Sequence, residues 1–276
     1  MGRKGMPSQR TQINLLGAWV DIVSPEETLE IMIDWCATRA RQYVVTPNLD
    51  HCRLLRSNVD FADAYEQSGL SVPDGWPLVA ASRVTKCHIK RRVTGSDLVI
   101  PLCRSLASKG FSIFLLGSSP EVLKASAEKL KEAAPGLIIC GSHSPPLDFE
   151  KDKHQVDVID RLITGLRPHA LIVALGAPKQ ELWMRAHIPH LPIGVALGVG
   201  GSLDFLTGKQ RRAPEIFQRL GFEWLWRAAH SPRRLGPRYL ACLMLLPLLS
   251  IAHLNQHLIT KHNTIRHRTV AIAANS

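Results

Sequence analysis

The stretch FSIFLLGSSPEVLKASAEKLKEAAPGLIICGS, residues 111–142, decides the fold class. It begins with an apolar, β-forming run over 111–117 and ends with a second one over 137–142. Between them, apolar side chains recur at helical spacing over Pro120–Ala134, and Ser119 in front of the first-turn proline is typical of a helix N-terminus. Strand, helix and strand in this order predict a βαβ unit, in which the two strands are parallel.

The same alternation extends from residue 40 to residue 205. The further candidate strands are Tyr43–Thr46, Leu70–Pro73, Ala170–Gly176 and Ile193–Val199. We therefore predict an α/β fold with a Rossmann-like, mostly parallel sheet and helices on both faces. Ligands of such folds bind beyond the carboxyl ends of the strands.

Charge divides the 276-residue chain unevenly. The formal net charge is +11, and residues 207–276 hold eleven Lys and Arg against two Glu. We predict an α/β core over 1–207 and a basic, helical C-terminal appendage over 208–276, with a loosely ordered polar tail from His253. The excess of cations indicates an anionic partner, for which nucleic acid, a diphosphate group and an anionic lipid surface are the candidates.

One apolar run stands out in this appendage, Tyr239–Ala252. Its 14 residues are fewer than the about 20 that a bilayer-spanning helix needs, and they include Pro247. Two interpretations stay open. The run lies in the membrane interface behind neighbouring arginines, or it is a helix buried against the core.

The carboxyl ends of the predicted strands hold the candidate catalytic and ligand-binding residues. Asp74 follows an apolar run and precedes Gly75, so it is either a general base at the edge of the sheet or the N-cap of a helix starting near Trp76. The turn Gly198–Gly201 lets backbone N–H groups approach a phosphate, or it is only a tight turn. Arg92 is either a ligand of a diphosphate or carboxylate or part of a solvated basic loop.

Several classes of site are disfavoured. There is no Cys-x-x-Cys pair, no Asp-x-Asp pair and no close His/Cys cluster, so we expect no bound metal and no cofactor. Because a leaving diphosphate would then need another source of positive charge, arginines are the candidates.

Taken together, the strand ends resemble the WecG/TagA/CpsF family of bacterial glycosyltransferases, glycosyltransferase family 26. The resemblance runs in order from about residue 14 to about residue 240. The motifs that carry it are Thr46-Pro47-Asn48, Val72-Pro73-Asp74-Gly75, Arg92-Val93-Thr94-Gly95, Gly176-Ala177-Pro178-Lys179-Gln180-Glu181, Gly198-Val199-Gly200-Gly201-Ser202-Leu203-Asp204-Phe205, Arg212-Ala213-Pro214 and Gly221-Phe222-Glu223-Trp224-Leu225-Trp226-Arg227.

The resemblance implies a cytoplasmic enzyme, peripheral on the inner face of the membrane, that moves a sugar from a UDP-sugar to a polyprenyl-diphosphate-linked saccharide with inversion. Such a reaction builds cell-envelope or extracellular polysaccharide. The sugar stays open among N-acetylmannosamine, a uronic acid and another hexose, and so does assembly into a homo-oligomer.

The resemblance also implies roles for individual residues. Asp74 would deprotonate the acceptor hydroxyl. The sugar and acceptor pocket would be lined by Thr46, Asn48, Arg92 and Gln180. The nucleotide would lie at Gly198, Gly200, Gly201 and Asp204. The appendage would close over the site, and the departing UDP would be neutralised by Arg227, Arg233, Arg234 and Arg238.

Two rival functions come from other classes. A nucleotide-binding oxidoreductase is disfavoured because Leu203 occupies the last glycine position of the dinucleotide fingerprint. A nucleic-acid-binding protein is suggested by the isoelectric point of about 9.7, but no nucleic-acid-binding motif accompanies it. We therefore expect no nucleic-acid partner.

Overall fold

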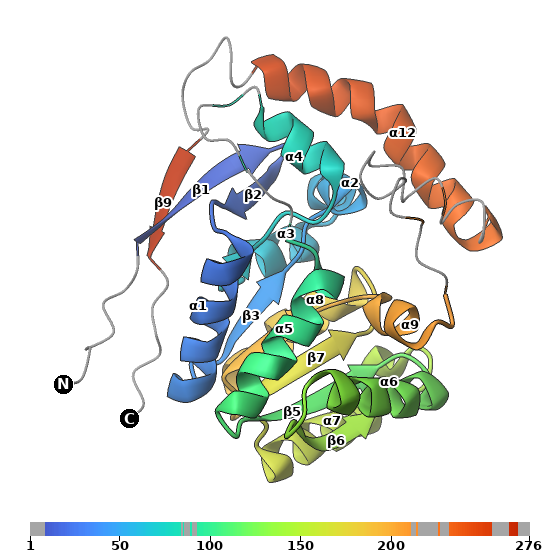
Figure 1. The fold of residues 1–276 in the computed structure, drawn as a ribbon. Helices are drawn as coiled ribbons and strands as arrows, with labels where there is room; N and C mark the ends of the chain where they lie inside the picture. The colour runs from blue at the N-terminus through green and yellow to red at the C-terminus, as the bar shows by residue number, and fades with distance from the viewer. Residues whose placement is uncertain are drawn as a thin grey trace.

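A computed structural model describes residues 9–83, 85, 89, 93–210, 214, 226, 232–255 and 265–269. The described residues form two β-sheets and the helices packed on them (Figure 1).

The central sheet confirms the predicted α/β class. Its six strands all pair in parallel, in the order β4-β3-β8-β7-β5-β6. All six predicted strands are present, with ends that differ from the prediction by a few residues. Their bounds are β3 Gln42–Val45, β4 Leu70–Ser71, β5 Ser112–Gly117, β6 Ile138–His143, β7 Ala170–Ala174 and β8 Val195–Gly198.

Helices cover both faces of this sheet, as predicted. Successive side chains of a strand point to opposite faces, so Ile113 and Leu115 join one apolar cluster while Phe114 and Leu116 join the other. The first cluster is covered by α1 Pro25–Thr38, α5 Gly95–Ser108, α6 Pro120–Ala133 and α9 Ser202–Thr207. The second is covered by α3 Val59–Glu66, α7 Lys153–Leu166 and α8 Lys179–His187, with short 3₁₀ turns at Phe149–Lys151 and Ile188–His190.

The helix after β5 begins where the sequence predicts, but the cap differs. Ser119 is the N-cap residue of α6 and Pro120 follows it, yet the Ser119 side chain makes no capping hydrogen bond. Its hydroxyl instead accepts a hydrogen bond from Lys209 Nζ at 3.2 Å. The start of α6 is therefore set by backbone conformation and the first-turn proline.

A second sheet joins the two ends of the chain, and the sequence did not predict it. Strand β1, Gln9–Leu15, pairs antiparallel with β2, Ala18–Asp21, on one side and with β9, Ile265–Thr269, on the other (Figure 1). The expectation of a loosely ordered tail from His253 is thus wrong for the residues of β9. Arg266 of this strand lies over the Trp19 ring, 4.4 Å from its centroid, which ties the tail to β2.

A buried ion pair links the second sheet to the edge of the central one. Asp21, only 1% exposed, lies 3.6 Å from Arg10 Nε and accepts hydrogen bonds from Gln12 Nε2 at 3.0 Å and from the Ser71 N–H at 2.7 Å. Burial raises the pKa of Asp21 and lowers that of Arg10. Since Ser71 belongs to β4, this carboxylate holds β2 against the central sheet.

Two short helices and one long one complete the arrangement. Helices α2, Leu49–Ser57, and α4, Trp76–Ser82, pack against the second sheet, where Cys52 and Leu78 are fully buried. The predicted apolar run lies within a longer helix, α12, Pro232–Leu254, which packs against α2. In the described part of the chain, no helix combines the length and the hydropathy that crossing a bilayer requires.

The Asp21 network generates a prediction about stability. Replacing Asp21 with Asn leaves the buried Arg10 cation without its counter-charge, so we expect a loss of about 3 kcal/mol in the free energy of unfolding. Urea denaturation measures this loss. The matched control is Asp34→Asn, the same change at an exposed position of α1. Equal unfolding midpoints for the two variants would show that the ion pair is not a structural link.

Candidate functional site

Four strand-to-helix turns meet at the carboxyl edge of the central sheet. They follow β3, β4, β7 and β8, and they form a cavity of about 260 Å³, called here the strand-end cavity. Because all these strands are parallel, their carboxyl ends share one edge, which is where folds of this class bind ligands. The turns contribute Thr46 and Asn48, Asp74 to Pro77, Gly176 and Ala177, and Val199 to Ser202.

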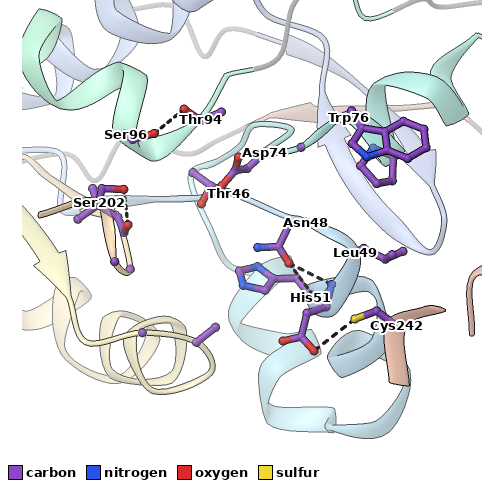
Figure 2. A pocket seen from close by; sticks show the side chains of 18 of the residues that line it. Thr46, Asn48, Leu49, His51, Asp74, Trp76, Thr94, Ser96, Ser202 and Cys242 are labelled. Carbon is purple, nitrogen blue, oxygen red and sulfur yellow. Dashed lines mark hydrogen bonds between the residues drawn. The ribbon is translucent and has the colours of Figure 1, made fainter. Parts of the chain in front are cut away.

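Asp74 lines the strand-end cavity, half-buried, with Thr46 beside it (Figure 2). Its backbone N–H donates to the Pro47 carbonyl at 2.8 Å, which fixes the turn after β4 to the turn after β3. The N-cap of α4 is Gly75, at φ +107°, and that cap has no side-chain hydrogen bond. The alternative role of Asp74 as the helix cap is therefore wrong.

Asn48 is held by the start of α2. Its Oδ1 accepts hydrogen bonds from the N–H groups of Asp50 at 3.0 Å and His51 at 3.2 Å, so it is the N-cap of that helix. The amide nitrogen of Asn48 lies on the other side of this group, away from the two capping bonds (Figure 2). It is a donor available to the cavity that Asn48 lines.

Gln180 supports the glycine turn after β8. Its Oε1 accepts a hydrogen bond from the Gly200 N–H at 3.0 Å, and its Nε2 donates to Glu181 Oε1 at 2.8 Å. A Cβ on Gly198 would lie 3.0 Å from Gln180 Nε2, so the glycine makes room for this side chain. Gly200 adopts φ +50°, a conformation that side chains disfavour.

The residues predicted for the nucleotide separate in the structure. Gly200 and Gly201 line the strand-end cavity together with Gln180, whereas Gly198, at the end of β8, and Asp204, on α9, are not among the lining residues. Gly198 lies next to the cavity and contacts Gln180, which lines it.

The arginines predicted to bind the substrate or the departing UDP are only partly described by the structure. Arg92 and Arg227 lie outside the described residues. Arg233, Arg234 and Arg238 belong to the first two turns of α12, where the structure describes the backbone but not these side chains.

Helix α12 forms one wall of the strand-end cavity. Leu243 and Leu246 line it, and Cys242 Sγ lies 3.8 Å from Asp50 Oδ1 on α2. Near the end of the helix, His253 Nε2 is 2.9 Å from the Ala81 carbonyl of α4. Elsewhere on α12, the apolar side chains of Leu240, Met244 and Ile251 are all more than half exposed.

The sequence prediction missed several lining residues. Thr94 and Ser96 come from the start of α5, where Thr94 Oγ1 accepts from the Asp97 N–H at 3.1 Å. Thr94 lies within the motif Arg92-Val93-Thr94-Gly95, but the predicted binding role was assigned to Arg92 alone. His51 lies one turn after Asn48 and was a further detectable candidate. The contribution of Leu243 and Leu246 has no local signal, since it depends on where α12 docks.

A metal site would need several ligand side chains close together. Among the residues that the structure describes, no group of three or more His, Cys, Asp or Glu side chains is placed to hold an ion. Metal independence stays a prediction.

Comparisons with known proteins agree with one another. The model of the family described as "Glycosyl transferase WecG/TagA/CpsF family" matches residues 13–262. Among curated relatives is the N-acetylglucosaminyldiphosphoundecaprenol N-acetyl-beta-D-mannosaminyltransferase of Staphylococcus aureus strain MW2, 27% identical over 231 residues that cover 83% of this chain and 89% of the relative. The enzyme of the same name from strain NCTC 8325 / PS 47 is similar to the same extent.

The hydrogen bond from the Gly200 N–H to Gln180 can be tested by substitution. In Gln180→Ala, the Gly200 N–H loses its acceptor, which at about 1 kcal/mol corresponds to roughly fivefold faster hydrogen exchange of that amide. Exchange measured by NMR on the labelled protein tests this. Gln67→Ala, at an exposed position after α3, is the control. Unchanged exchange at Gly200 in Gln180→Ala would contradict the supporting role.

Proposed function

Because the chain belongs to the WecG/TagA/CpsF family and is therefore a glycosyltransferase, we propose that it moves a sugar from a UDP-sugar to a polyprenyl-diphosphate-linked saccharide. The family membership favours a transferase over the oxidoreductase and nucleic-acid-binding alternatives. The product would enter a cell-envelope or extracellular polysaccharide. The observation that carries the proposal is the position of Asp74 in a cavity that joins the strand ends to α12.

The relatives narrow the choice of substrates. Their printed name gives N-acetylmannosamine as the transferred sugar and N-acetylglucosamine on diphosphoundecaprenol as the acceptor. We propose these two as the first substrates to try. At 27% identity the pocket can differ in detail, so uronic acids and other hexoses belong in the same panel.

The chemistry needs one base and one means of stabilising the leaving group. We assign Asp74 as the base. Its carboxylate takes the proton of the acceptor hydroxyl while that oxygen forms a bond to the anomeric carbon of the donor, and the bond from that carbon to UDP breaks. A single displacement of this kind inverts the anomeric carbon. No second carboxylate is required.

We assign the leaving diphosphate to the glycine turn and the appendage. Gly200 and Gly201 line the cavity, and because the Gly200 N–H is bonded to Gln180, we assign the Gly201 N–H as the backbone donor to a phosphate. The remaining charge is assigned to Arg92, Arg227, Arg233, Arg234 and Arg238, and Asp204 and Gly198 are assigned to the shaping of the nucleotide site. In this scheme residues 1–207 are the catalytic core, and residues 208–276 form the lid and the membrane-facing segment.

Membrane contact is assigned to α12. Its one face lines the cavity through Leu243 and Leu246, while Leu240, Met244 and Ile251 lie exposed on the helix. Apolar side chains next to several arginines suit a membrane interface with anionic headgroups. A lipid-linked acceptor would then meet the cavity at the membrane surface. We propose the inner face of the cytoplasmic membrane as the location.

The base role of Asp74 predicts the effect of a conservative substitution. Asp74→Asn removes the base but keeps the size of the side chain, so we expect transfer to fall at least about 100-fold while UDP binding changes little. UDP release is measured with a panel of UDP-sugars and lipid-diphosphate-linked saccharides, and UDP affinity by calorimetry. Asp60→Asn, at an exposed position of α3, is the control. Retained turnover would remove Asp74 from the base role.

Metal independence predicts that a chelator does not inhibit the enzyme. Since we assign the stabilisation of the diphosphate to arginines and backbone N–H groups, excess EDTA should leave the rate of UDP release within about twofold of its value without chelator. The same assay with added Mg²⁺ or Mn²⁺ completes the test. A strict requirement for either ion would refute the metal-independent scheme.

The assignment of membrane contact to α12 predicts weaker vesicle binding when an exposed apolar side chain of this helix is replaced. Met244 is 71% exposed. The substitution Met244→Glu removes an apolar contact with lipid and adds a charge that anionic headgroups repel. We expect at least about fivefold weaker co-sedimentation with phosphatidylglycerol vesicles. Leu147→Glu, at an exposed loop position, is the control. Equal sedimentation of both variants would remove α12 from the membrane contact.

A further inference from the structure

The strand-end cavity has an apolar part where α2, α4 and α12 meet. Five of its lining side chains come from these helices and form what is called here the apolar wall: Leu49, Trp76, Pro77, Leu243 and Leu246. In Figure 2, Leu49 and Trp76 lie on the same side of Asp74 as Cys242, the residue before Leu243. The proposed base therefore has an apolar surface on one of its sides.

Two contacts place α12 across α2 and α4. Cys242 Sγ lies 3.8 Å from Asp50 Oδ1, in the first turn of α2. His253 Nε2 lies 2.9 Å from the Ala81 carbonyl oxygen, near the end of α4. Leu246 lies between these two contacts along α12 and lines the cavity. The apolar wall is therefore built from three helices that are far apart in the chain.

The apolar wall keeps much of its surface accessible. Trp76 is 39% exposed and Leu243 is 44% exposed, although both line the cavity. At about 100° per residue, Leu243 lies roughly a quarter turn from Cys242 and roughly a quarter turn from Met244. Cys242 packs on α2, whereas Met244 is 71% exposed. The apolar surface therefore continues from the cavity to the exposed part of α12 that we assign to the membrane.

We propose that the apolar wall binds the isoprenoid chain of the lipid-linked acceptor, at the isoprene units next to the diphosphate. The inference rests on the proposed transferase function and deepens it, because it names the part of the cavity that receives the lipid. The acceptor in the name of the relatives is linked to diphosphoundecaprenol, which has a long apolar chain. A UDP-sugar has no such chain, so the acceptor is the substrate that can cover the wall. The donor then occupies the other side of Asp74, where Ser96 and Ser202 lie (Figure 2).

Binding of the chain has a consequence for catalysis. Contacts to a part of a substrate that does not react can hold the reacting end in place, which here is the acceptor hydroxyl near Asp74. Trp76 suits this role because an indole offers a large apolar surface with few rotatable bonds. It follows Gly75 at the start of α4, so the same turn positions the base and the indole. We therefore expect an isoprenoid chain to increase the rate of transfer even when no membrane is present.

Two acceptors that differ only in their chain test the proposal. Both are N-acetylglucosamine diphosphates, one with a farnesyl group below its critical micelle concentration and one with a methyl group, and no vesicles are added. With the donor that gives the fastest UDP release, we expect wild type to show at least about tenfold higher kcat/KM for the farnesyl acceptor. In Trp76→Ser this ratio should fall to about threefold or less, because the chain loses its largest apolar contact. Equal ratios in wild type and Trp76→Ser, or a wild-type ratio near one, would overturn the proposal.

Two further variants sharpen this comparison. Trp76→Leu keeps an apolar side chain, so it should retain most of the preference for the farnesyl acceptor. If Trp76 instead stacked on a sugar, Trp76→Leu and Trp76→Ser would lose activity with both acceptors alike and the ratio would not change, which would contradict the inference. The control is Leu147→Ser, at a loop position that is 95% exposed, and it should keep the wild-type ratio. Leu243→Ser takes the place of Trp76→Ser if that variant does not fold.

Photolabelling locates the chain without any turnover. The probe is N-acetylglucosamine diphosphate carrying a farnesyl group with a diazirine on its first isoprene unit. After irradiation and proteolysis, we expect mass spectrometry to find the label on Trp76 or Leu243, and an excess of the unlabelled farnesyl acceptor to prevent the labelling. Labelling that avoids the apolar wall would refute the inference.

These measurements separate two failures. If wild type transfers sugar with equal kcat/KM to both acceptors, the inference about the apolar wall fails and the proposed function stands. If wild type releases no UDP with any pair of substrates, the transfer scheme fails, and the photolabelling still decides whether the apolar wall binds an isoprenoid chain.

Discussion

The parallel pairing of β3 with β8 is the contact on which the strand-end cavity depends. It aligns Val44 with Leu197 and so places the turn that begins at Thr46 beside the turn that begins at Val199. The start of α5 packs onto the same place, and a Cβ on Gly95 would lie 3.3 Å from the Gly198 carbonyl oxygen. Because the pairing is parallel, turns far apart in the chain leave the sheet in one direction and enclose one volume.

The chain closes this volume from its C-terminal end. Helix α12 supplies one wall, and β9, which follows it in the chain, pairs with β1. The family match ends at residue 262, which leaves β9 outside the matched range. Through its pairing with β1, this strand attaches the C-terminal part of the chain to the sheet that the N-terminal strands form.

Charge is divided between the two sides of the cavity. The described lining includes the carboxylates of Asp50 and Asp74, and among those described residues it holds no Lys or Arg. The appendage of residues 208–276 carries the excess of cations. A diphosphate needs positive charge, which this described lining does not supply, and we therefore propose that Arg92 and the arginines of the appendage supply it.

The sequence by itself determined the parallel α/β sheet, the six strands and the strand-end motifs that hold Asp74, Asn48 and Gln180, because strand and helix periodicity and turn-forming residues are local signals. Only the tertiary structure decided that Gly75 rather than Asp74 caps α4, that residues 265–269 form a strand, and that Tyr65 lies against His51. Each of these features depends on a residue distant in the chain or on backbone dihedral angles. Such contacts and angles leave no periodic pattern in the sequence.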